Sequence, residues 1–241
     1  MIVFYTDFGG GPYLGQMEAA VYRAGSGLTV VNLLSRAPRF RPKLAAYLLA
    51  AYPGEFPAGT VFVCVVDPGV GQPERGAVVL WADERWFVGP DNGLFDVLVA
   101  RAGRVRCWDI DWRRFAPSAS FHGRDVFAPI AAVLARGGSP PGKERAPTTR
   151  VGTVWPEDLP EVVFIDDYGN AMTGVRACVL DEGGRVMVGG RVLPRARTFS
   201  DMPPGQAFWY SNSVGLVELA VNQGRADELL GLSLGHPVTL Q

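Results

Sequence analysis

The sequence of 241 residues contains little lysine, histidine and cysteine, and it has no long apolar run. Lysine occurs only at Lys43 and Lys143 and the formal net charge is -1, so the chain lacks the clustered basic face that nucleic acid requires. No stretch reaches the roughly 18 uninterrupted apolar residues of a membrane helix, and residues 1–7 predict a strand rather than a secretion signal. We therefore expect neither a nucleic-acid partner nor a membrane partner.

The three cysteines, Cys64, Cys107 and Cys178, are scattered singly along the chain. They form no Cys-x-x-Cys pair and no Cys/His cluster, which predicts that no metal is bound. Three separate thiols are typical of a reduced, cytoplasmic protein. The glycine-rich segments match neither Gly-x-Gly-x-x-Gly nor Gly-Lys-Ser/Thr, so neither a Rossmann dinucleotide site nor a phosphate loop is supported.

Hydrophobic residues make up 48% of the chain, which is enough for a packed core, and the first part alternates between strand and helix patterns. This alternation predicts an α/β N-terminal domain over residues 1–142, with a central, mostly parallel sheet and flanking helices. The predicted strands cover residues 2–6, 28–34, 60–66, 77–81, 85–88 and 105–109, the fourth and fifth as a hairpin pair. The predicted helices cover residues 14–24, 41–51, 94–102 and 125–136.

The pattern changes after a segment rich in proline, glycine and charge, from which we predict a linker at residues 143–150. Short strand patterns separated by Gly, Pro and Asp turns then predict a smaller all-β domain over residues 151–241, either an antiparallel barrel or a sandwich. The predicted strands cover residues 161–165, 176–180, 185–188, 191–193, 207–210 and 216–221, and a short helix covers 226–230.

A buried strand pattern runs directly into Asp67 and the turn Pro68-Gly69-Val70-Gly71, with Arg75 shortly after it. Ligands of open α/β sheets bind at the carboxyl ends of strands, so Asp67 is a candidate to orient or activate a small nucleophile. Arg75 could hold Asp67 ionised. The alternatives are a turn-forming aspartate before proline and a surface arginine.

His122 is one of only two histidines, and an unperturbed pKa of about 6.5 makes it the natural proton acceptor. The alternative is a histidine that starts a helix and bonds to the backbone. Its neighbours Arg124 and Asp125 are expected to form a structural ion pair and helix cap. Asp7, at the end of the first strand, could accept both hydroxyls of a ribose or form an Asx turn or helix cap.

Three polar turns complete the set of candidate binding segments. The turn Pro90-Asp91-Asn92-Gly93 offers either a substrate contact or a plain turn. The segment from Asp166 to Asn170 ends a predicted strand with two carboxylates, an aromatic ring and an amide. These groups suit an ammonium group with a purine or carboxylate nearby, or they form a polar hairpin turn. The segment Ser211-Asn212-Ser213-Val214-Gly215 offers adenine-edge hydrogen bonds or only a turn.

In this order along the chain, these segments resemble the S-adenosyl-L-methionine hydroxide adenosyltransferases, the hydrolytic relatives of the fluorinase and chlorinase. The motifs are Thr6-Asp7-Phe8-Gly9, Val65-Val66-Asp67-Pro68-Gly69-Val70-Gly71, Pro90-Asp91-Asn92-Gly93-Leu94-Phe95, Phe121-His122-Gly123-Arg124-Asp125-Val126-Phe127-Ala128-Pro129, Asp167-Tyr168-Gly169-Asn170 and Asn212-Ser213-x-Gly215-x-x-Glu218-x-Ala220-x-Asn222. Any one motif is weak, whereas the ordered set is highly specific.

The resemblance implies an N-terminal α/β domain and a C-terminal β-barrel domain, in a homotrimer with active sites between subunits. It also implies hydrolysis of S-adenosyl-L-methionine to adenosine and L-methionine without a cofactor. It implies that Asp67, Arg75 and His122 activate water. The substrate-binding positions that it implies are Asp7 (ribose), Phe40 (an aromatic wall), Asn92, Gly123, Asp166, Tyr168, Asn170, Ser213 and Glu218.

The chain departs from the family pattern in two places. Residues 32–38 lack the usual Asp and His, and Thr173-Gly174 replaces the usual Thr-Asn. Two other functions stay open: a halogenase of the same family, which Asp67 disfavours because its charge would repel a halide, and a sensor that binds S-adenosylmethionine without reaction.

Overall fold

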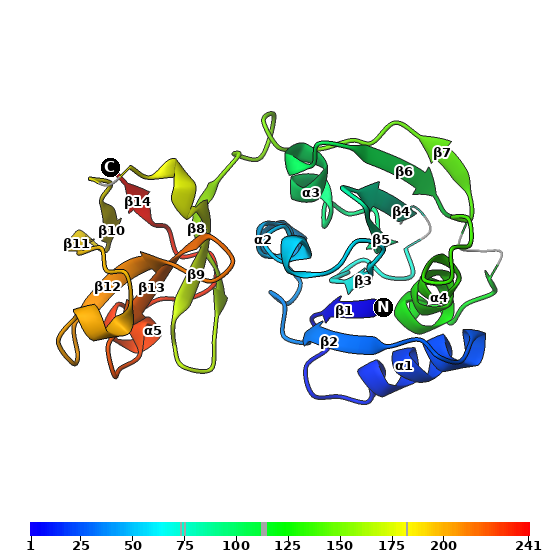
Figure 1. Cartoon of the computed structure of the whole chain (residues 1–241), viewed down its shortest axis with the longest axis horizontal. Helices are drawn as coiled ribbons and strands as arrows, with labels where there is room; N and C mark the ends of the chain where they lie inside the picture. Colours follow the sequence, from blue (N-terminus) through cyan, green and yellow to red (C-terminus); the bar gives the residue numbers. More distant parts are fainter. Residues whose placement is uncertain (73, 75, 112–114, 182) are drawn as a thin grey trace. The chain divides into compact units, whose positions relative to one another are not determined.

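The computed structural model describes residues 1–72, 74, 76–111, 115–181 and 183–241. The chain divides into two compact units, Met1–Val151 and Gly152–Gln241. Figure 1 shows the first in blue to green and the second in yellow to red. Among the described residues, no helix is both long enough and apolar enough to pass through a membrane.

The N-terminal unit is built on a seven-stranded sheet with the order β2-β1-β3-β5-β4-β6-β7. Its strands are β1 (Ile2–Thr6), β2 (Val30–Leu34), β3 (Val61–Val65), β4 (Ala77–Ala82), β5 (Arg85–Pro90), β6 (Val105–Asp109) and β7 (Lys143–Arg145). Its helices are α1 (Tyr13–Ala24), α2 (Pro42–Leu49), α3 (Asp96–Arg101) and α4 (Ala128–Leu134), with a 3₁₀ turn at Pro53–Glu55.

The central strands β1 and β3 are buried along their whole length on both faces, which explains their continuous apolar sequence. Along β1, Ile2 and Phe4 belong to the core that includes residues of α1 and α4. The alternate residue Tyr5 is also fully buried, and its hydroxyl donates a 2.9 Å hydrogen bond to the carbonyl of Ala45 in α2. Because side chains alternate along a strand, α1 and α4 cover one face of the sheet and α2 covers the other.

The prediction of a mostly parallel sheet was wrong, because the sheet is mixed. The pairs β1–β2, β1–β3 and β3–β5 are parallel, whereas β4–β5, β4–β6 and β6–β7 are antiparallel. The change follows from the hairpin, whose predicted pairing is confirmed. Its two turn residues, Asp83 and Glu84, have φ of 42° and 67°, the left-handed pair of a tight two-residue turn.

Part of the predicted linker is a strand. Residues Lys143–Arg145 form β7 and pair with β6, with Trp108 opposite Glu144. Arg106 on β6 makes two hydrogen bonds of 2.8 and 2.9 Å to the carboxylate of Glu144. Cross-strand charge pairing thus overrides the proline- and glycine-rich composition on which the linker was based.

The C-terminal unit contains two antiparallel sheets, as expected for an all-β segment. One has the order β12-β13-β9-β8 and the other β11-β10-β14. The elements are β8 (Leu159–Ile165), β9 (Ala171–Arg176), β10 (Val186–Val188), β11 (Arg191–Leu193), β12 (Ala207–Ser211), β13 (Leu216–Val221), α5 (Ala226–Leu229) and β14 (Thr239–Leu240), with 3₁₀ turns at Ala177–Val179 and Phe199–Asp201. Closure of these sheets into a barrel stays a prediction.

The strand predicted at residues 176–180 was wrong. The strand in this region is β9, which ends at Arg176, and Ala177–Val179 is a 3₁₀ turn. Arg176 is fixed by Asp158, whose carboxylate accepts hydrogen bonds from the Arg176 backbone and guanidinium at 2.9 and 2.8 Å. This side-chain anchor ends the strand, a feature that apolar alternation does not reveal.

Candidate active site

A cavity of ≈ 390 Å³ opens in the N-terminal unit beside the carboxyl ends of β1 and β3. These two strands are parallel neighbours, so the residues that follow them meet at one edge of the sheet. The cavity is lined by Asp7, Phe8, Tyr13, Arg39, Phe40, Val65, Asp67, Val70, Ser120, Phe121, His122, Gly123 and Phe127.

Asp7 and Phe40 are held together at the rim of this cavity. The backbone N–H of Phe40 donates a 3.3 Å hydrogen bond to Oδ2 of Asp7. Burial raises the pKa of the Asp7 carboxyl; that hydrogen bond and the charge of Arg39 oppose the rise, and the charge of Asp67 adds to it. Phe40 adopts φ of 59°, and its side chain is 72% exposed, so a strained backbone presents the ring beside the carboxylate.

Asp67 is oriented by its own turn and by the neighbouring β5 turn. Its Oδ1 accepts a 3.1 Å hydrogen bond from the backbone N–H of Gly69 and lies 3.5 Å from Nδ2 of Asn92. Asn92 also donates from Nδ2 to the carbonyl of Val66 at 2.9 Å and accepts from the N–H of Leu94 at 3.2 Å. Asn92, which was predicted to bind substrate, therefore contacts the turn at Asp67 and does not belong to the lining of this cavity. Arg75 lies outside the described residues.

His122 precedes a π-helical turn, Gly123–Phe127, that leads directly into α4. The imidazole is only 3% exposed, and burial lowers the pKa of His122 below its usual 6.5. The charges of Asp67 and Asp125 oppose this shift. A neutral imidazole near a carboxylate is suited to accept a proton. Gly123 allows close packing behind the wall, because a Cβ there would lie 3.2 Å from Sδ of the buried Met17.

The predicted ion pair beside His122 is confirmed, but the predicted helix cap is wrong, because Asp125 lies inside the π-helical turn and neither this turn nor α4 has a side-chain cap. Arg124 contacts Asp125 with Nε–Oδ1 of 2.6 Å and Nη2–Oδ2 of 2.9 Å, and it also donates to Oε1 of Gln16 at 3.0 Å. Asp125 accepts a 2.9 Å hydrogen bond from the N–H of Ser118. The pair fastens the His122 segment to α1 and to the loop before it.

Sequence reasoning did not assign a role to three aromatic residues of the cavity. The rings of Phe8, Tyr13 and Phe121 lie within 5.4–5.8 Å of one another, centroid to centroid. Edge-on ring contacts of this kind form a rigid apolar wall. Phe8 and Phe121 stand next to Asp7 and His122 in the sequence, and this adjacency was the available signal.

A second cavity of ≈ 890 Å³ lies in the C-terminal unit. It is lined by Asp166, Asp167, Tyr168, Asn170, Met172, Phe199, Tyr210, Asn212, Ser213, Glu218, Val221, Gln223, Gly224 and Arg225. Five of the predicted substrate-binding residues therefore meet here: Asp166, Tyr168, Asn170, Ser213 and Glu218. The other cavity brings together Asp7, Phe40, Asp67, His122 and Gly123.

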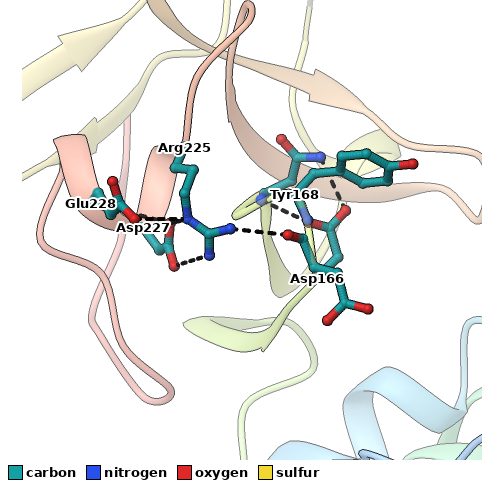
Figure 2. Close-up of polar contacts among 7 residues, drawn as sticks. Asp166, Tyr168, Arg225, Asp227 and Glu228 are labelled. Carbon is teal, nitrogen blue, oxygen red and sulfur yellow. Dashed lines mark hydrogen bonds and ion pairs between the residues drawn. The ribbon is translucent and has the colours of Figure 1, made fainter.

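The turn between β8 and β9 supports one wall of this second cavity (Figure 2). Oδ1 of Asp166 accepts 2.9 Å hydrogen bonds from the backbone N–H groups of Tyr168 and Asn170. Its Oδ2 accepts a 3.0 Å bond from Nδ2 of Asn170. The carboxylate thus stabilises a polar hairpin turn, which presents the 79% exposed ring of Tyr168 at the cavity.

Glu218 on β13 places a second carboxylate in the same cavity. Its side chain is 2% exposed and accepts hydrogen bonds from the hydroxyl of Tyr210 at 2.7 Å and from Nδ2 of Asn212 at 2.8 Å. Burial raises the pKa of Glu218, the two donors oppose the rise, and Asp166 adds to it. Ser213 lies in the exposed turn after Asn212. The sequence patterns did not single out Tyr210, which lies on the same face of β12 as the buried Phe208.

Both units of the chain match domains of known proteins. The description "SAM hydroxide adenosyltransferase N-terminal domain" matches residues 2–143, and "SAM hydroxide adenosyltransferase C-terminal domain" matches residues 160–239. A protein of Thermus thermophilus named (R)-S-adenosyl-L-methionine hydrolase is 40% identical, covering 99% of this chain and 98% of its own. A protein of the same name from Salinispora arenicola is 37% identical over 97% of this chain and 95% of its own.

Two solved structures are similar along the whole chain. The crystal structure of an uncharacterized conserved protein from Thermotoga maritima has a TM-score of 0.88 and 30% identity and covers 100% of both chains. That of a conserved hypothetical protein from Thermus thermophilus has a TM-score of 0.78 and 39% identity, with 100% of this chain and 99% of the other covered. Together with the two matching domains, these similarities show that the chain belongs to the SAM hydroxide adenosyltransferase family.

Proposed function

We propose that this chain is an S-adenosyl-L-methionine hydrolase that forms adenosine and L-methionine. The observation that carries the proposal is the set of curated relatives named (R)-S-adenosyl-L-methionine hydrolase, three of which match 97–99% of this chain at 34–40% identity. We propose the (R) form, as named in those relatives, as the substrate here. In the reaction, water attacks the 5′ carbon of the ribose, a C–O bond forms, and the C–S bond breaks.

The electron pair of the broken bond leaves with sulfur, so the product L-methionine is a neutral thioether. Because the positively charged sulfonium already makes methionine a good leaving group, we propose that no cofactor or metal takes part. The barrier then lies in positioning and desolvating the water. One water proton must go to a base, a step that typically contributes about 10²–10⁴-fold to the rate.

We propose Asp67, Arg75 and His122 as the groups that activate this water. The buried, neutral imidazole of His122 is suited to take the proton, and the hydrogen bond from Gly69 fixes the orientation of the Asp67 carboxylate. The role of Arg75 rests on the family resemblance alone.

The remaining residues are proposed to hold the substrate. Asp7 accepts hydrogen bonds from the ribose hydroxyls, and the exposed ring of Phe40 covers the ligand beside it. Asn92 supports the Asp67 turn, and Gly123 contributes to the wall of the cavity, where close packing against Met17 favours glycine. The cavity that contains Asp166, Tyr168, Asn170, Ser213 and Glu218 receives the methionine and adenine parts.

The proposal also includes the architecture that the resemblance implies: a barrel in the C-terminal unit and a homotrimer with active sites between subunits. A cytoplasmic location fits the three free thiols, of which Cys64 and Cys107 are buried.

The test is to incubate the purified protein with each sulfonium epimer of S-adenosylmethionine and to follow the products by chromatography, with and without chloride. We expect equal amounts of adenosine and methionine, independent of chloride. A chlorinated nucleoside would instead identify a halogenase. Intact substrate in a stoichiometric complex would identify a sensor and refute the hydrolase.

A further inference from the structure

Arg225, which neither the motifs nor the proposed mechanism uses, lies beside the turn that runs from Asp166 to Asn170 (Figure 2), and both belong to the lining of the second cavity. The segment that contains Arg225 follows β13 and leads into α5, so it is about 60 residues away from the turn in the sequence. The Asp166 carboxylate holds the turn from within. Arg225 and Asp227 hold it from the neighbouring segment.

The guanidinium of Arg225 is engaged on three sides. Its Nη1 donates a 2.9 Å hydrogen bond to the backbone carbonyl of Asp167, at the centre of the turn. Its Nε and Nη2 bind the two carboxylate oxygens of Asp227 at 3.1 and 2.8 Å, in the parallel fork that arginine forms with carboxylates. A further contact of 3.0 Å joins Nε to Oε1 of Glu228, whose side chain is 75% exposed.

Asp227 fastens the same turn at a second point. Its backbone N–H donates a 3.0 Å hydrogen bond to the carbonyl of Gly169. The approach is so close that a Cβ on Gly169 would lie 2.4 Å from Oδ1 of Asp227 and 2.9 Å from Cβ of Arg225. Gly169 also has φ of +83°, so both the conformation and the contact require glycine at this position.

We infer that Arg225 is a positioning residue for substrate binding, which acts by holding the 166–170 turn in its ligand-ready shape. This inference rests on the proposed function, because that function assigns Asp166, Tyr168 and Asn170 to the ligand. A turn that is fixed before binding loses less conformational entropy when the ligand arrives, so the affinity is higher. Since its donors face Asp167, Asp227 and Glu228, Arg225 stabilises the turn rather than binding the carboxylate of the methionine part.

The test compares four variants of the full chain: Arg225→Ala, Arg225→Lys, Asp227→Asn and the control Glu228→Gln. For each, KM and kcat for S-adenosylmethionine are measured, together with the Kd of adenosine by calorimetry and the thermal midpoint. Adenosine is informative because it lacks the methionine carboxylate. The control removes a charge from the same cluster at its most exposed member.

We expect Arg225→Ala to raise both KM and the adenosine Kd by about tenfold, the typical effect of losing a hydrogen bond from a charged group, with kcat within about twofold of the original. Arg225→Lys keeps the charge but not the fork, so its effect is intermediate. Asp227→Asn shifts both constants in the same direction, and Glu228→Gln leaves them unchanged.

A lower thermal midpoint with unchanged KM and Kd would reduce Arg225 to a purely structural residue and overturn the inference. A rise in KM with an unchanged adenosine Kd would mean that Arg225 binds the methionine carboxylate directly, which also overturns it. If Arg225→Ala does not fold, Arg225→Lys and Asp227→Asn decide by the same criteria. If the unsubstituted protein binds adenosine but does not hydrolyse S-adenosylmethionine, the proposed function is refuted, and the adenosine Kd of the variants still tests the role of Arg225. If the unsubstituted protein binds neither ligand, both the proposed function and the role of Arg225 are refuted.

Discussion

Replacement of Phe40 should separate stability from substrate binding. Phe40 has φ of 59°, in the left-handed region, and its side chain is 72% exposed, so little apolar burial offsets the strain. That conformation costs an L-residue about 1–2 kcal/mol, whereas glycine adopts it freely but loses about 0.5–1 kcal/mol more entropy on folding. The balance favours Phe40→Gly by up to about 1.5 kcal/mol, which raises the thermal midpoint by up to about 6 °C in a chain of this size.

The same substitution removes the aromatic wall beside Asp7. Covering part of the ring with substrate is worth about 1.4 kcal/mol, since full burial of a phenylalanine gives about 1.5–3 kcal/mol, so KM should rise about tenfold. The matched control is Phe40→Ala, which removes the ring but keeps the strained L-residue backbone. It should show the same rise in KM without the gain in stability.

Differential scanning calorimetry and initial-rate kinetics on the three proteins decide the matter. If Phe40→Gly unfolds at the same temperature as Phe40→Ala or below it, the backbone of residue 40 does not carry the strain that we infer from its positive φ. If neither variant changes KM, the ring is not part of the substrate site. The combination of higher stability and weaker binding would show that the strain is retained for function.

Three further predictions concern the cavity that contains Asp67 and His122, and the turn beside it. Asp67→Asn and His122→Asn should each lower kcat by about 10²–10⁴-fold with little change in KM, and near-normal turnover by chromatography would exclude them as the groups that activate water. The acid limb of kcat/KM should lie below pH 6.5, because burial lowers the pKa of His122 and only its neutral form accepts a proton. Asp67 raises that pKa, so in Asp67→Asn the limb should move to lower pH, and a shift to higher pH would contradict the assignment. Gly71→Ala should destabilise the fold by more than about 1 kcal/mol in thermal unfolding, since its φ is +84° and the new Cβ would lie 2.6 Å from the carbonyl oxygen of Ala119, whereas the control Gly10→Ala has open space.

The sequence predicted the central N-terminal strands β1 and β3 well because they are buried on both faces and read as continuous apolar runs. The order in which the strands pair was less accessible. The hairpin at Asp83 and Glu84 turned half of the sheet antiparallel, although neither residue is the glycine or asparagine typical of such turns. Strand β9 was missed because Thr173 and Gly174 interrupt its apolar pattern, and Thr173 instead donates its hydroxyl to the Val217 carbonyl at 2.8 Å.

The two groups of candidate residues differ in how they could be found. Asp7 and Asp67 follow neighbouring parallel strands, so physical reasoning alone brings them to one edge of the sheet. Phe40 could be assigned only through the family resemblance, because its role depends on a backbone conformation that no local pattern announces. Arg225 gave no signal, since it acts on a turn that is distant in the sequence.

The π-helical turn at Gly123–Phe127 has a consequence for the length of the chain in this region. A π-turn holds one more residue than an α-helical turn. Deleting one residue there would yield a regular helix, but each residue turns the helix by about 100°. His122 and the chain before it would then be rotated by about this angle relative to α4. Substitutions can therefore change the side chains of this segment one at a time. The number of residues between His122 and α4 cannot change without reorienting His122, on which the proposed chemistry depends.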